Sequence, residues 1–82
     1  MTPFAFTYHQ RDCMGNFIHS EKGYGWIKVY FFEHSAIILR SGIQTKDNRM
    51  IWVQNVQHGE PVWPHELIQA MGEGIESNGV LL

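Results

Sequence analysis

The segment spanning residues 26–32, Trp-Ile-Lys-Val-Tyr-Phe-Phe, restricts the possible folds of this chain more than any other. Every residue in it except Lys28 is β-branched or aromatic, and such residues favour a β-strand. Side chains alternate between the two sides of a strand, so Ile27, Val29 and Phe31 form one purely apolar face. The opposite face carries aromatic rings and a lysine. The segment therefore predicts a strand with one core face and one unusual face.

Other short segments of the first 56 residues also have the pattern of strands. Extended segments are expected at residues 4–9, 17–18, 26–32, 36–39 and 50–56. The pair Gly15-Asn16 signals a turn between the first two. In the last segment Ile51 and Val53 share an aliphatic face, whereas Trp52 points to the other side. This order of strands and short turns predicts a β-meander.

A helix is expected at residues 64–76, where Pro64 suits the first turn because its missing N–H needs no partner there. The apolar stripe of this helix, wide enough to cover one sheet face, consists of Leu67, Ile68, Met71 and Ile75. Residues 1–82 thus predict a single α+β domain. It is a small antiparallel β-meander or OB-like barrel of four to five strands with one C-terminal helix.

Composition limits the classes of function. The chain has 82 residues and a formal net charge of −2, so no global basic field attracts phosphates, and any nucleic-acid binding must be local. A lone cysteine, Cys13, cannot form an internal disulfide and favours a reducing compartment, so we expect a cytoplasmic protein. We also expect no membrane span, because no run approaches the roughly 18 apolar residues required.

The unusual face of residues 26–32 needs a cover or a use, because one short helix can cover only one face of a sheet. It consists of Trp26, Lys28, Tyr30 and Phe32, and Trp52 of the last strand is expected to accompany it. A closed barrel or a homodimer would bury these side chains. Alternatively, exposed rings stack on unpaired bases while a nearby lysine contacts phosphate.

The run Lys22-Gly23-Tyr24-Gly25-Trp26-Ile27 resembles the nucleic-acid-binding motif K-G-[FY]-G-[FY]-I of cold-shock domains. Residues 31–37 are similar to that family's second motif, and residues 42–45 to a later loop. The resemblance covers roughly residues 13–56 and implies an OB-type barrel that binds single-stranded RNA or DNA. It implies stacking by Phe17, Tyr24, Trp26 and Phe31 and a backbone contact by Lys22. It also places a hairpin between the two motifs, whereas the strand pattern predicts one continuous strand.

Other reactive side chains do not form a recognisable catalytic or metal-binding pattern. His9, Cys13 and His19 lack the paired short spacings of a four-ligand zinc site, and Cys13 has no orienting group or oxyanion site in the pattern. We therefore expect no metal, no cofactor and no enzymatic activity. Two hypotheses remain. The first is a cold-shock-like binder of single strands, and the second is an interaction module that homodimerises through its aromatic sheet face.

Overall fold

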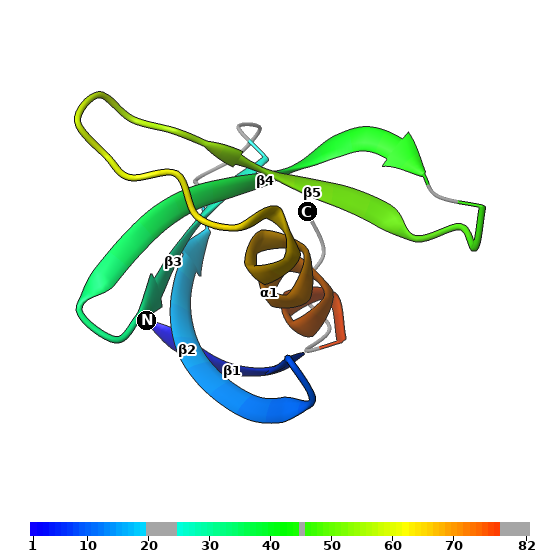
Figure 1. Cartoon of the computed structure of the whole chain (residues 1–82), viewed down its shortest axis with the longest axis horizontal. Helices are drawn as coiled ribbons and strands as arrows, with labels where there is room; N and C mark the ends of the chain where they lie inside the picture. Colours follow the sequence, from blue (N-terminus) through cyan, green and yellow to red (C-terminus); the bar gives the residue numbers. More distant parts are fainter. Residues whose placement is uncertain (20–24, 45, 78–82) are drawn as a thin grey trace.

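The computed structural model describes residues 1–19, 25–44 and 46–77, which form five strands and one helix (Figure 1). The elements are β1 (Thr2–Tyr8), β2 (Arg11–His19), β3 (Trp26–Phe31), β4 (His34–Gln44), β5 (Met50–Asn55) and α1 (His65–Ser77). Consecutive strands pair antiparallel in the sheet order β1-β2-β3-β4-β5. Figure 1 shows this sheet curled into a half-barrel, with α1 lying inside the curve. The predicted α+β class and the C-terminal helix are confirmed.

The core lies between the inner face of the curled sheet and α1. Ile27 and Val29 on β3 are fully buried, as the apolar face of this strand predicts. The complete set of buried apolar side chains is Phe4, Phe6, Phe17, Ile27, Val29, Ala36, Ile38, Trp52, Ile68, Met71 and Ile75. Every strand and the helix contribute to it, so the core depends on all six elements.

Two glycines let α1 approach both edge strands of the sheet. A Cβ atom on Gly72 would overlap the ring of Trp52 on β5, and one on Gly74 would overlap the carbonyl oxygen of Ala5 on β1. Because glycine has no Cβ, the helix backbone can lie directly against these groups. The helix therefore spans the gap between β1 and β5 and closes the open side of the half-barrel.

The predicted turn at Gly15-Asn16 is wrong, because both residues lie inside β2. The chain turns earlier, at His9 and Gln10, whose φ values of 50° and 62° are those of a tight two-residue hairpin turn. Gly15 has a different role. A Cβ there would lie 2.9 Å from the carbonyl oxygen of Tyr30 and 3.1 Å from the Phe4 ring, so this position needs glycine for close packing.

The prediction that Trp52 lies on the outer side of the sheet is also wrong. In the β4–β5 register Val53 pairs with Leu39 and Trp52 with Arg40, so Trp52 faces inward and is 0% exposed. Its indole ring lies against Gly72, and its Nε1–H donates a hydrogen bond to Glu76 at 2.5 Å. The larger apolar side chain thus occupies the core, while Val53 lies half-buried on the opposite face.

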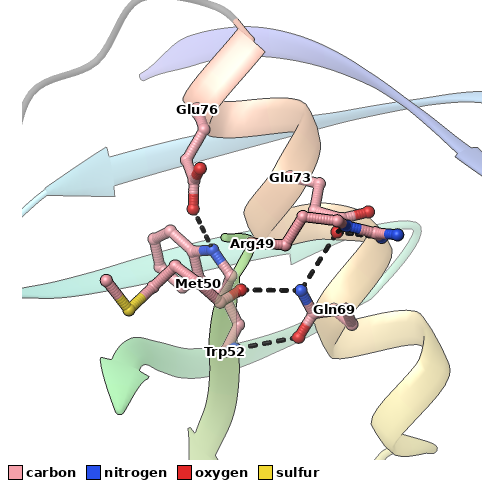
Figure 2. Close-up of polar contacts among 6 residues, drawn as sticks. All are labelled: Arg49, Met50, Trp52, Gln69, Glu73 and Glu76. Carbon is pink, nitrogen blue, oxygen red and sulfur yellow. Dashed lines mark hydrogen bonds and ion pairs between the residues drawn. The ribbon is translucent and has the colours of Figure 1, made fainter. Parts of the chain in front are cut away.

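The free edge of β5 is occupied by side chains of the helix. The backbone N–H of Trp52 donates to Gln69 Oε1 at 2.9 Å, and Gln69 Nε2 donates to the carbonyl oxygen of Met50 at 2.8 Å (Figure 2). His65 Nε2 donates to the carbonyl oxygen of Trp52 at 3.0 Å. One amide side chain therefore pairs with β5 much as another strand would, and it blocks that edge.

The edge of β1 is obstructed as well. Gly74 of the helix lies against the carbonyl of Ala5, and Pro3 has no N–H to offer a further strand. The two edges of the half-barrel are thus poor templates for strand addition. Among the described residues, no helix is long and apolar enough to cross a membrane.

Candidate interaction surfaces

The convex side of the sheet presents a continuous band of side chains across β2, β3, β4 and β5. We call this band the outer face; its apolar and basic members are Ile18, Trp26, Lys28, Tyr30, Ile37, Leu39 and Val53. The same pairing places three uncharged polar side chains at its margins, Asn16, Ser35 and Asn55. The register sets the rows, since Trp26 pairs with Leu39, and Lys28 with Ile37. Directly paired residues of antiparallel strands project to the same side. The outer face is therefore fixed by strand pairing and opposes the buried residues Ile27 and Val29.

The composition of the outer face is unusual for a surface in contact with water. A solvated sheet face normally carries polar side chains, whereas Ile37, Leu39 and Val53 are aliphatic. Among the described residues of this face, Lys28 is the only charged one, and its Nζ lies 5.5 Å from the centre of the Tyr30 ring. The ammonium group is thus close enough to the ring for a cation–π interaction.

The structure separates the residues that the cold-shock resemblance implies for base stacking. Phe17 is 2% exposed and lies in the core, so it has no free ring face. Phe31 lies on the inner side of β3, where its ring packs edge-on against Phe6 at 5.2 Å. Trp26 lies on the outer face. Tyr24 and Lys22 fall outside the described residues. The described members of the set therefore do not form one stacking platform.

The hairpin implied by the resemblance also lies at a different place in the chain. β3 runs without a break from Trp26 to Phe31, and the turn that follows consists of Phe32 and Glu33. The segment similar to the second motif, residues 31–37, therefore crosses this turn instead of lying along one strand. The kinship itself stays a prediction.

Phe32 leaves the outer face and forms a second feature. Its φ of 57° puts it in the left-handed region, and its side chain is 87% exposed. It lies at the rim of an open groove of about 240 Å³ between the β3–β4 turn and the start of α1. The groove is lined by Phe31, Phe32, His34, Val62, Trp63, Pro64 and Leu67. Of the predicted dimer-face residues, Trp26, Lys28 and Tyr30 stay together, whereas Phe32 and Trp52 lie elsewhere.

A polar cluster joins α1 to the beginning of β5 (Figure 2). Arg49 forms an ion pair with Glu73, and this carboxylate also accepts a hydrogen bond from Gln69 at 3.1 Å. The hydrogen bond and the negative charge of Glu73 raise the pKa of Arg49 above its ordinary value. Glu73 and Glu76 are thus engaged with β5, although helix periodicity alone suggests a solvated face. Their partners come from residues about 24 positions earlier, which no local pattern reveals.

The histidines and Cys13 do not assemble into a site within the part of the chain that the structure describes. No group of three or more His, Cys, Asp or Glu side chains there is arranged to hold a metal ion. Cys13 is half-buried against the core, and His65 is engaged with the β5 backbone. Among the described residues, the outer face and the groove beside Phe32 are the apolar candidate surfaces for recognition.

Comparison of the chain with models of known protein families, with curated proteins and with solved structures found no significant match.

Proposed function

We propose that this chain is a small non-enzymatic binding protein that self-associates through its outer face. The observation that supports this proposal is the aliphatic and aromatic composition of the outer face on the central strands β3 and β4. Two such faces can pack in the manner of a β-sandwich, with the sheets about 10 Å apart and their strands within about 30° of each other. A pair related by a two-fold axis would remove the apolar side chains of both copies from water.

The protected edges favour face-to-face association over strand addition. Gln69 and His65 already occupy the hydrogen-bonding groups of β5, and Gly74 of the helix lies against β1. Contact between two copies therefore has to come from side chains. On the outer face, the row formed by Trp26, Leu39 and Val53 offers a continuous apolar strip for this contact.

Sedimentation velocity at tens of micromolar protein tests this proposal, with a matched pair of charge substitutions on β4. We expect wild type to sediment as a dimer and Leu39→Glu to sediment as a monomer, because the substitution buries a carboxylate in the interface. Ile43→Glu is the control. Ile43 lies on the same strand but beyond Leu39, where the pairing of β4 with β3 ends, and is 63% exposed, so this variant should remain dimeric. A monomeric wild type, or equal behaviour of the two variants, contradicts the proposal.

Single-strand nucleic-acid binding on the same outer face is a second candidate function. The observation in its favour is that Trp26 and Tyr30 remain on one face, with the cation of Lys28 between them in sequence and close to the Tyr30 ring. Each stacked base contributes about 1–3 kcal/mol. Titration with oligo-dT at low salt would then quench tryptophan fluorescence, and Trp26→Leu would lose most of the quenching. Unchanged fluorescence of the wild type rules this candidate out.

A further inference from the structure

Phe32 occupies a position that is costly for its residue type. The two-residue turn between β3 and β4 needs a positive φ at its first residue, a conformation that glycine adopts freely and bulky side chains rarely adopt. The large ring is also 87% exposed, so burial within the chain does not offset the strain. A strained and exposed aromatic residue is typical of a functional contact. We therefore expect the Phe32 ring to act in a contact outside the core.

The groove beside Phe32 has firmly held walls. The backbone N–H of Trp63 donates to Gln54 Oε1 at 2.8 Å, and Gln54 Nε2 donates to the carbonyl oxygen of Pro61 at 3.1 Å. The first turn of α1 closes at Pro64, whose carbonyl oxygen accepts from the N–H of Leu67 at 3.0 Å. Anchoring on β5 therefore holds the loop that carries Trp63 in place. A ligand would meet a preformed surface and would pay little ordering entropy.

The size of the groove excludes a globular partner as its sole occupant. The groove has a volume of about 240 Å³ and seven lining residues, whereas a standard interface between folded proteins involves about 20–30 residues on each side. A stable interface between two folded proteins buries about 800 Å² on each side. The groove is therefore suited to a short extended peptide.

The chemistry of the lining indicates which kind of peptide fits. Aromatic rings and a proline dominate it, and His34 is its one ionisable side chain among the described residues. Trp63 adds an indole ring to this lining, and an indole N–H is a donor of the kind that peptide carbonyls accept. Proline-rich segments in the polyproline II conformation dock in such aromatic-lined grooves, since their carbonyls are free and their rings are apolar. We propose that the groove binds a short, uncharged, proline-rich segment of a partner protein, at a place separate from the outer face.

Titration with a synthetic ten-residue polyproline peptide, followed by tryptophan fluorescence and by chemical-shift changes of groove residues, tests this inference. We expect saturable binding by wild type, and Phe32→Gly should weaken it about tenfold or more because it removes one wall of the groove. Trp63→Phe keeps a ring but loses the N–H donor, and it should weaken binding as well. Ile43→Glu, which lies outside both the groove lining and the proposed dimer interface, should bind as wild type does.

A stability measurement separates a binding role of Phe32 from a structural one. Glycine adopts a positive φ without strain, so Phe32→Gly should raise the midpoint of thermal unfolding by about 4 °C or more while binding is lost. A lower midpoint would mean that Phe32 supports the fold, and it would overturn the inference. Failure of wild type to bind the peptide would do so too. So would a shift of Phe32→Gly from dimer to monomer in sedimentation, because the occupant would then be a second copy. A lower midpoint, or failure of wild type to bind the peptide, would leave the proposed dimerisation through the outer face unaffected.

Discussion

Gly72 and Trp52 form a matched pair in which the missing side chain of one makes room for the ring of the other. Glycine within a helix costs about 1 kcal/mol of stability relative to alanine, so helix propensity alone disfavours Gly72. In return, the largest side chain of the core lies flat on the helix backbone and its indole N–H reaches Glu76. Gly72 thus leaves room on the helix for the residue of β5 that the register turns inward.

Gly72→Ala should destabilise the protein by about 1–2 kcal/mol in urea unfolding, although alanine is the better helix former. The added methyl overlaps the Trp52 ring, and overpacking a core costs about 1–3 kcal/mol. In a Trp52→Leu background the same substitution should be neutral or stabilising, because the smaller side chain can rotate away. Equal losses in both backgrounds would show that the two residues are not coupled.

At the scale of the elements, the sequence predicts most of the strands and the helix, but not the side-chain contacts that protect the edges of the sheet. Alternation over residues 26–32 and the stripe Ile68, Met71 and Ile75 identify the inner faces correctly, because burial of apolar side chains follows backbone periodicity. A glycine can indicate either a turn or a site of close packing within a strand. Gly15 resembles a turn signal, yet it lies in β2 against the Phe4 ring. Local patterns carry no information on the partner of Gln69, which lies 17 to 19 residues away on β5.

The candidate surfaces were predictable to a smaller extent. Trp26, Lys28 and Tyr30 share the outer face as strand alternation requires, and the register adds Leu39 and Val53, which alternation within one strand cannot supply. By strand alternation Phe32 would also lie on the outer face. However, β3 ends at Phe31, and the turn points the side chain of Phe32 elsewhere. The polar run Glu33-His34-Ser35 predicts a tight connection between the two strands. The turn consists of Phe32 and Glu33, one residue earlier, because no glycine, asparagine or proline marks its start.

Gln69→Ala should cost about 1–3 kcal/mol of stability, because it leaves the N–H of Trp52 and the carbonyl of Met50 without their side-chain partner. Amide hydrogen exchange at Trp52 should become faster, and the exposed edge should increase aggregation on heating. Gln57→Ala serves as the control. Its amide bonds only to the nearby carbonyl of Asn55 on the surface, so a change within about 0.5 kcal/mol is expected. Similar effects of the two substitutions would show that the β5 edge is not protected by Gln69.

At the scale of the whole molecule, the helix is the element that turns a curved sheet into a protein with a core. Its residues Ile68, Met71 and Ile75 are fully or almost fully buried, and they meet side chains from strands at both edges of the sheet. Without them the inner face of the half-barrel would contact water. A sheet with both faces exposed has no means of offsetting the conformational entropy of its five strands.

A chain that ends at residue 63 should therefore lack a cooperative unfolding transition and show the narrow amide dispersion of an unfolded protein by NMR. A full-length chain with Ile75→Ala tests the same contact less severely. It should remain folded but lose about 2–5 kcal/mol if the domain has that much stability, as expected for truncating a buried isoleucine. A truncated chain with native-like dispersion would show that the sheet is stable alone.

The position of the helix after all five strands has a consequence for biosynthesis. A ribosome delivers a chain from its N-terminus, so the strands emerge before the segment that covers their inner face. During that interval Phe6 and Trp52 lack the helix glycines Gly74 and Gly72 that lie against them, and the edge of β5 lacks Gln69. We therefore expect the nascent sheet to be prone to aggregation until the core residues of α1 have been synthesised.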